Sequence, residues 1–252
     1  MHRSIEEGGV IGSRDQIEAE LDNRRMLLLG HRGCRGEFME NTFAAFDHAL
    51  ESGCDGFELD VRRTADAIPI IWHDARLRGR FISRQLYAKL HERCSLARRL
   101  PRRPVIDLCQ LEEVLARYAL VSWIDIELKV KGLETQVAAL LGRYRPARGF
   151  VISSFRRRIL LDVHRVDPML PLAFIFDRMP RSNAWRDLPI QYVKPSARLV
   201  TPSRVRQFHA EGKQVLTWTV NHPSMVRRLV EAGVDGMIGD DPVMLARTLA
   251  RR

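Results

Sequence analysis

Acidic and imidazole side chains interrupt two apolar runs in the stretch GCDGFELDVRRTADAIPIIWHD, residues 53–74. Glu58 and Asp60 lie two positions apart in a strand-like run, so their side chains point to the same face. Two neighbouring carboxylates repel each other unless a cation lies between them, and hard oxygen ligands suit Mg²⁺ or Ca²⁺. His73 ends the second run and could move a proton near neutral pH. The pattern predicts a cation site beside an imidazole; salt bridges from the acids to arginines are the alternative.

The stretch IDIELKV, residues 124–130, repeats this arrangement. Asp125, Glu127 and Lys129 alternate with apolar residues, so the three charged side chains share one face of a predicted strand. An acid from this strand could join the cation site as a third carboxylate, with Lys129 beside it. A buried ion pair without any catalytic role explains the same pattern, and both interpretations stay open.

Three further residues follow or end predicted strands. His31 and Arg32 come directly after the apolar run MLLLG, and Trp218 lies near the end of the run QVLTWTV, residues 214–220. An imidazole at such a position can transfer a proton, and a guanidinium can grip an anion. Trp218 could form the wall of a small-molecule pocket or merely close the barrel, and we include it among the candidate substrate-binding residues.

Strand-like runs alternate with helical patterns along most of the chain, which predicts a parallel sheet covered by helices. Eight such units in about this length form a (β/α)8 TIM barrel, in which residues just past the strand ends line the active site. We expect helices to begin at an Asn41 cap and at Pro223, and to end at Gly53 and Gly233. The sequence offers nine strand candidates, residues 26–30, 56–61, 68–72, 120–130, 149–154, 170–176, 190–194, 214–220 and 234–239.

A barrel of this kind has eight strands, and the one extra candidate lies within residues 56–74. Only RRTADA separates two strand-like runs there, which is too short for a parallel crossover. We therefore predict an antiparallel hairpin that bends over one end of the barrel. A turn near Asp66 would bring His73 opposite Leu59 and Asp60, within reach of both acids.

Composition indicates an ordinary globular protein, with residues 1–24 as an N-terminal arm or helix and residues 25–252 as one barrel domain. The net charge of +10 comes mostly from arginine, because only five of the 41 basic residues are lysines. The basic clusters lack interleaved aromatic residues, so we expect no nucleic-acid partner. No apolar run is long enough for stable membrane insertion, and no secretory signal is recognisable, so we expect a cytoplasmic protein. The cysteine spacing predicts free thiols at Cys34, Cys54, Cys94 and Cys109.

Several separated motifs resemble the glycerophosphodiester phosphodiesterase family. They occur in the family's order and span residues 26 to 248. The matching stretches are HRG (31–33), ENTFAAFDHALESGCDGFELDV (40–61), IIWHD (70–74), IELK (126–129), VISSF (151–155) and VLTWTVNHPSMVRRLVEAGVDGMIGDDP (215–242).

The resemblance implies a metal-dependent hydrolase built on a TIM barrel. It implies one divalent cation, Mg²⁺ or Ca²⁺, with Glu58, Asp60 and Glu127 as its ligands. It also implies that His31 and His73 are the two general acid/base residues. The substrate would be a small phosphodiester from lipid breakdown, and self-association into a homo-oligomer is left open.

The same resemblance implies that Arg32 and Lys129 contact the phosphate. In the family mechanism, one histidine deprotonates the glycerol hydroxyl next to the ester, and the other protonates the leaving alcohol. Water then opens the cyclic phosphate, which gives sn-glycerol 3-phosphate. A hydroxyl on the same substrate is favoured over bulk water by its effective molarity.

A few positions depart from the family pattern. Met39 stands where the family usually has proline, Asp66-Ala67 replaces Asp-Gly, and Gly239 replaces a threonine. The stretch after Asp74 also differs, so we expect the departures to affect substrate choice rather than the metal ligands or the histidines.

Two alternative functions remain open at this stage. The same barrel could cleave lysophospholipids or sphingolipids in the manner of a phospholipase D. Alternatively, the chain could be a basic phosphate- or nucleic-acid-binding protein without catalysis. The second alternative explains the paired histidines poorly, because a binding protein does not need two proton carriers.

Overall fold

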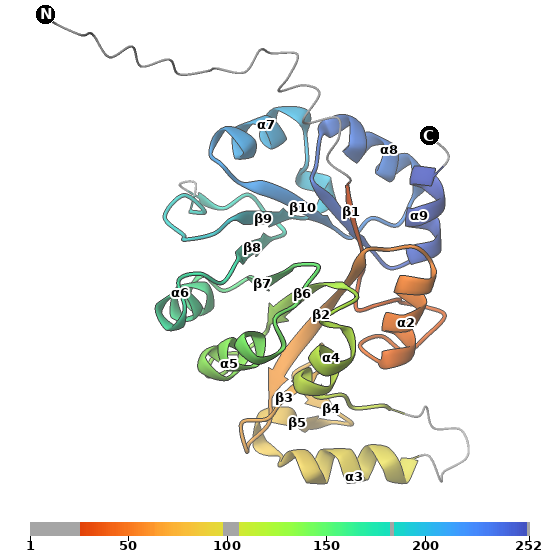
Figure 1. The fold of residues 1–252 in the computed structure, drawn as a ribbon, viewed down its shortest axis with the longest axis vertical. Helices are drawn as coiled ribbons and strands as arrows, with labels where there is room; N and C mark the ends of the chain where they lie inside the picture. The colour runs from red at the N-terminus through yellow and green to blue at the C-terminus, as the bar shows by residue number, and fades with distance from the viewer. Residues whose placement is uncertain (1–25, 98–105, 182–183, 251–252) are drawn as a thin grey trace, which may run out of the picture.

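Eight parallel strands form a closed barrel in the computed structural model, which describes residues 26–97, 106–181 and 184–250 (Figure 1). The barrel closes because the first strand, β1, pairs with both β2 and β11. This arrangement confirms the predicted (β/α)8 barrel. The barrel strands are β1 (Leu27–Gly30), β2 (Gly56–Arg63), β6 (Trp123–Leu128), β7 (Phe150–Ser154), β8 (Leu172–Phe176), β9 (Tyr192–Pro195), β10 (Gln214–Trp218) and β11 (Gly236–Gly239).

Amphipathic helices cover the outside of the barrel (Figure 1). Helix α8 illustrates the local logic: it begins at Pro223, turns Val226 and Leu229 inward, and ends before Gly233, whose φ of 81° suits glycine. Both predicted ends of this helix are confirmed. The outer helices are α2 (Phe43–Glu51), α4 (Leu111–Tyr118), α5 (Glu134–Tyr144), α6 (Arg157–Val166), α7 (Pro202–Ala210), α8 (Pro223–Ala232) and α9 (Pro242–Ala250).

The start of α2 differs from the sequence prediction. The cap is Thr42, whose hydroxyl accepts a hydrogen bond from Ala45 N, and not Asn41. Asn41 instead donates its side-chain amide to Asp60 Oδ2 at 2.9 Å. The side chain of Asn41 therefore bonds a residue distant in sequence, Asp60, and does not cap the helix as its local preference would predict.

Strand β2 packs one face against the outer helices and turns the other face toward the interior of the barrel. Its outward residues are apolar, and Phe57 stacks on Phe46 of α2 with ring centroids 4.2 Å apart. Burying one such aromatic side chain stabilises the fold by about 2–3 kcal/mol. Its inward residues include Glu58 and Asp60, so burial of the apolar face fixes which way the acids point.

The predicted hairpin is confirmed. Strand β3 (Pro69–Ile71) runs antiparallel to β2, with Val61 opposite Ile71. Trp72 N donates to Asp60 O at 2.9 Å and extends the pairing toward His73. The nine predicted strands are therefore the eight barrel strands and β3.

A small insertion follows the hairpin. It lies beyond the end of β2, where Figure 1 shows α3. It contains a two-stranded sheet and a helix, and its own apolar cluster includes Ile82 and Leu90. The elements are β4 (Arg76–Leu77), β5 (Arg80–Phe81), η1 (Ile82–Arg84) and α3 (Tyr87–Ala97); a further short helix, η3 (Ala197–Leu199), follows β9.

Three remaining expectations concern the chain as a whole. The predicted N-terminal arm, residues 1–24, lies outside the described residues. All four cysteines are unpaired and buried, as predicted. Among the helices of the described ranges, none combines the length and the apolar character that crossing a bilayer requires.

Candidate active site

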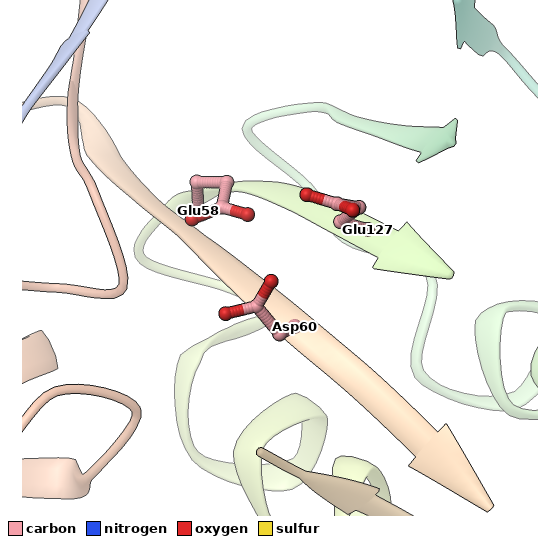
Figure 2. A group of neighbouring side chains, drawn as sticks. All are labelled: Glu58, Asp60 and Glu127. Atoms are coloured by element: carbon pink, nitrogen blue, oxygen red, sulfur yellow. The ribbon is translucent and has the colours of Figure 1, made fainter. Parts of the chain in front are cut away.

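Three buried carboxylates lie together inside the barrel (Figure 2). Strands β2 and β6 pair in parallel with Asp60 beside Glu127, and Glu58 lies two positions before Asp60 on the same face. One oxygen from each side chain lies within 4.8 Å of the others. The exposed fractions are 2% for Glu58, 0% for Asp60 and 7% for Glu127, so water screens their repulsion poorly.

The charges around the three acids are only partly balanced. Burial raises the pKa of Glu58 well above its usual value, and the charge of Asp60 raises it further. Burial alone would also raise the pKa of Asp60, but the charges of Lys129 and Arg32 outweigh burial and lower it. Lys129, Arg32 and Lys194 all act on the three acids, yet the pKa of Glu58 stays raised, so a further cation between the carboxylates would be favourable.

The donor set fits a hard divalent cation. Asp60 Oδ1 accepts no well-formed hydrogen bond within the described residues, although Lys129 Nζ lies 3.1 Å away. A buried carboxylate oxygen without such a bond is costly unless an ion or water satisfies it. Clustered carboxylate oxygens are the ligands that Mg²⁺ and Ca²⁺ prefer. The predicted metal ligands are thus brought together, and the alternative salt bridges are present as well.

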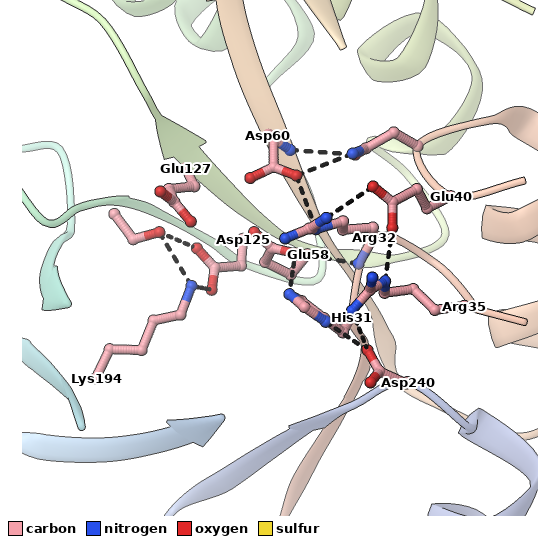
Figure 3. A network of polar contacts seen from close by, with 12 residues as sticks. His31, Arg32, Arg35, Glu40, Glu58, Asp60, Asp125, Glu127, Lys194 and Asp240 are labelled. Carbon is pink, nitrogen blue, oxygen red and sulfur yellow. Dashed lines mark hydrogen bonds and ion pairs between the residues drawn. The ribbon is translucent and has the colours of Figure 1, made fainter. Parts of the chain in front are cut away.

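Lys129 and Arg32 both contact the acids. Lys129 Nζ lies 2.7 Å from Glu127 Oε1 and therefore bridges this residue to Asp60. Arg32 Nε lies 3.0 Å from Asp60 Oδ2, and the backbone N–H of Arg32 donates to Glu58 Oε2 at 3.1 Å. Glu40 holds the far side of the Arg32 guanidinium at 2.7 Å (Figure 3).

His31 stands where the barrel closes. Its backbone N–H donates to Gly239 O, which places its ring beside Asp240. The ring Nδ1 lies 2.6 Å from Asp240 Oδ1, and Nε2 lies 3.9 Å from Glu58 Oε2 (Figure 3). Asn221 donates to the other oxygen of Asp240 at 2.6 Å. One nitrogen of His31 is thereby anchored, while the other faces the carboxylate cluster.

His73 approaches from the hairpin. Its backbone carbonyl accepts a hydrogen bond of 2.7 Å from Arg62 Nε, and its ring Nδ1 lies 2.8 Å from Asp74 Oδ1. Its side chain is about one-third exposed, which is more than that of His31. His73 is thus held at the mouth of the site, where it can meet a group that enters from solvent.

A single pocket of about 140 Å³ joins these groups. Trp218 lines this pocket. Of the two interpretations of this residue, a pocket wall or mere closure of the barrel, the structure therefore supports the pocket wall. Phe155 meets Trp218 edge-on at 5.5 Å between ring centroids. The lining residues are His31, Arg32, Glu58, His73, Glu127, Lys129, Phe155, Ile175, Lys194, Trp218 and Ile238.

Comparison with known proteins identifies the family. Residues 31–244 match the Glycerophosphoryl diester phosphodiesterase family, which is most of the chain. The chain belongs to this family. The predicted resemblance is confirmed, and the chain is therefore a phosphoric diester hydrolase.

Individual relatives agree with this assignment. A glycerophosphodiester phosphodiesterase of Bacillus altitudinis is 29% identical over 85% of this chain and 94% of its own length. A crystal structure of a family protein from Silicibacter pomeroyi has a TM-score of 0.78 and 28% identity, covering 91% of this chain and 94% of that one. A phosphodiesterase from Oleispira antarctica, crystallised with sn-glycerol 3-phosphate, shares the fold with a TM-score of 0.77 and 22% identity, over 89% and 96% of the two chains.

In this phosphodiesterase, Asp125 does not join the predicted metal ligands. It pairs with Lys194 of β9 at 2.5 Å and accepts a hydrogen bond of 2.6 Å from Ser153. The Glu–Lys ion pair that the sequence left open is present between Glu127 and Lys129, and Asp125 forms a second, buried pair with Lys194.

Sequence analysis did not include Asn41, Lys194 and Asp240 among the candidate site residues, although all three contact the site. Their sequence signals were present but ambiguous. Asn41 resembles a helix cap, Lys194 follows the apolar run IQYV at the end of a predicted strand, and Asp240 follows the last strand in IGDDP. A charged residue at the carboxyl end of a barrel strand is a candidate site residue, and this criterion would have found Lys194 and Asp240.

Proposed function

We propose that this phosphodiesterase hydrolyses glycerophosphodiesters to sn-glycerol 3-phosphate and an alcohol, with Mg²⁺ or Ca²⁺ bound by Glu58, Asp60 and Glu127. One observation supports this function above all others: Glu58, Glu127 and both imidazoles line one pocket, and Asp60 completes the carboxylate cluster beside it. When bound, the cation would supply Lewis-acid stabilisation of charge on the phosphoryl oxygens.

Arg32 and Lys129 are proposed to hold the phosphodiester. Both line the pocket and are already fixed by carboxylates, so little reorganisation is needed when the substrate binds. A divalent cation among the carboxylates would add positive charge to the site, which favours an anionic phosphodiester over a neutral ester.

His31 and His73 are proposed to transfer the protons. One takes the proton of the attacking hydroxyl, and the other donates a proton to the leaving alcohol. Asp240 holds Nδ1 of His31, so Nε2 is the atom available to the substrate. One ring is carried by the residue just after β1 and the other by the hairpin, and both line the same pocket.

Lysophospholipids are a second candidate substrate class. A lysophospholipase D of Rattus norvegicus is 24% identical over 88% of this chain and 85% of its own length. Phe155, which is 41% exposed, stands beside Trp218 and offers an apolar surface at the edge of the pocket. An acyl chain on the glycerol would find such a surface favourable.

A substrate panel tests the proposal. Glycerophosphocholine, glycerophosphoethanolamine, lysophosphatidylcholine and a duplex DNA would each be incubated with Mg²⁺, Ca²⁺ or EDTA. We expect cation-dependent release of sn-glycerol 3-phosphate from the glycerophosphodiesters and no change in the mobility of the DNA. Choline release from the lysolipid alone would favour the second candidate, and absence of turnover with every diester would refute both.

A further inference from the structure

Lys194 is a buried cation that faces the pocket. It is the next-to-last residue of β9 with 2% of its surface exposed, and it is among the residues that line the pocket. Its Nζ donates to Asp125 Oδ2 at 2.5 Å and to Ser153 Oγ at 3.2 Å (Figure 3). Ser153 in turn donates to Asp125 Oδ1, so each member of the group fixes the other two.

The geometry of this group directs Lys194 toward the pocket. An ammonium group has three N–H donors, and Asp125 and Ser153 take two of them. Neither of these partners lines the pocket, whereas Lys194 does. Within the described part of the chain, one donor of the ammonium group therefore remains available to a bound molecule, while Asp125 balances the charge of the free site.

Lys194 keeps its charge despite burial. Burial alone would lower its pKa, but the carboxylates of Asp125 and Glu58 outweigh burial and raise it. The same ammonium charge opposes the rise in the pKa of Glu58 that burial and Asp60 produce. Lys194 thus acts electrostatically on the carboxylate cluster as well as on the pocket.

We propose that Lys194 is a third phosphodiester-binding cation of this pocket, held in place by Asp125 and Ser153. This inference rests on the proposed function and extends it, because Arg32 and Lys129 are the cations assigned to the phosphate so far. Lys194 reaches the pocket from β9, whereas Lys129 is carried by the end of β6 and Arg32 by the end of β1. Cations on three separate strands would surround the phosphodiester and fix its orientation for the two histidines.

Substitution of Lys194, alone and together with Asp125, distinguishes phosphodiester binding by Lys194 from a purely structural role. Lys194→Met removes the charge with little change in volume, but it leaves Asp125 without its partner. The double variant Asp125→Asn/Lys194→Met replaces a neutral ion pair by a neutral pair of similar size. A merely structural role predicts that the double variant recovers wild-type kinetics, whereas a pocket cation cannot be recovered in this way.

The measurements are steady-state kinetics with glycerophosphocholine and calorimetric titration of Mg²⁺ and of sn-glycerol 3-phosphate. We expect both variants to raise KM and to weaken sn-glycerol 3-phosphate binding by about tenfold, with a smaller change in kcat. Affinity for Mg²⁺ should increase in Lys194→Met, where a positive charge near the carboxylates is lost, and stay equal in the double variant, where the net charge is unchanged. Arg227→Met, an exposed substitution on α8, is the matched control and should leave all three quantities unchanged.

Chemical rescue provides a second readout. In Lys194→Ala, ethylammonium chloride should lower KM toward the wild-type value, while tetramethylammonium chloride at equal ionic strength should not. Lys194→Met fills the vacated space, so ethylammonium should have no effect on it.

Two results would overturn the role of Lys194: wild-type KM in the double variant, or parallel loss of Mg²⁺ affinity and thermal stability in all variants. The proposed function fails separately, if the wild-type enzyme turns over no glycerophosphodiester. The titration with sn-glycerol 3-phosphate would still test Lys194 in that case.

Discussion

Nδ1 of His31 lies 2.6 Å from Oδ1 of Asp240, although 209 positions separate the two residues. The contact exists because β1 and β11 close the barrel side by side, with Gly30 beside Gly239. Asn221 bonds the second oxygen of the same carboxylate, so the orientation of the imidazole is fixed through two links. A histidine held in this way presents a defined nitrogen to its substrate.

Asp240→Asn should lower kcat for glycerophosphocholine by about 100-fold with little change in KM, because the carboxylate that holds Nδ1 of His31 is lost. Steady-state kinetics over a range of substrate concentrations would measure both constants. Arg227→Ala is a suitable control, since Arg227 is an exposed residue of α8 and should leave both constants unchanged. Equal kcat values for Asp240→Asn and the wild type would show that Asp240 does not act through His31.

His31→Ala and His73→Ala should each reduce turnover of glycerophosphocholine by about 10²–10⁴-fold. A glycerol phosphodiester with a 4-nitrophenol leaving group needs no general acid. The variant that lacks the acid should therefore regain much of its rate with this substrate, and the variant that lacks the base should not. Full activity of either variant on glycerophosphocholine would remove that histidine from the mechanism.

Divalent cations should stabilise the protein against heat. At a cation concentration of 100 times Kd the gain is about 2.7 kcal/mol, which for a chain of this size corresponds to a rise in Tm of roughly 5–10 °C. Asp60→Asn should abolish most of this rise, because it removes a ligand oxygen. The control Glu112→Gln changes an acid on α4 that pairs with Arg143, and it should keep the full rise. A wild-type Tm that does not respond to Mg²⁺, Ca²⁺ or EDTA would contradict the proposed metal site.

Ala67→Gly should increase the free energy of unfolding by about 0.5–1 kcal/mol. Ala67 has a φ of 61° in the hairpin turn, where a side chain is strained and glycine is not. Chemical denaturation would measure the change. Ala88→Gly, the same substitution at an exposed position of α3, should instead destabilise by about 1 kcal/mol. Equal effects at the two positions would show that the backbone strain at Ala67 is negligible.

Local sequence pattern was sufficient for the barrel strands, the hairpin and the shared face of Glu58 and Asp60, whereas the grouping of Glu127 with them followed from the family resemblance. Side chains alternate along a strand, and burial of Phe57 and its outward neighbours leaves the acids only the inner face. The short RRTADA connection likewise excludes a parallel crossover, so the direction of β3 follows from length alone.

The partners of these side chains depended on the tertiary structure. The sequence placed Asp125 beside Lys129 on one strand face, yet its partner is Lys194, 69 positions away. It offered Asn41 as a helix cap, yet Asn41 bonds Asp60. Periodicity within a segment determines which face a residue occupies, because that is set by backbone geometry. Which residues meet inside the barrel is set by strand order, register and closure, and these arise only when the whole sheet is assembled.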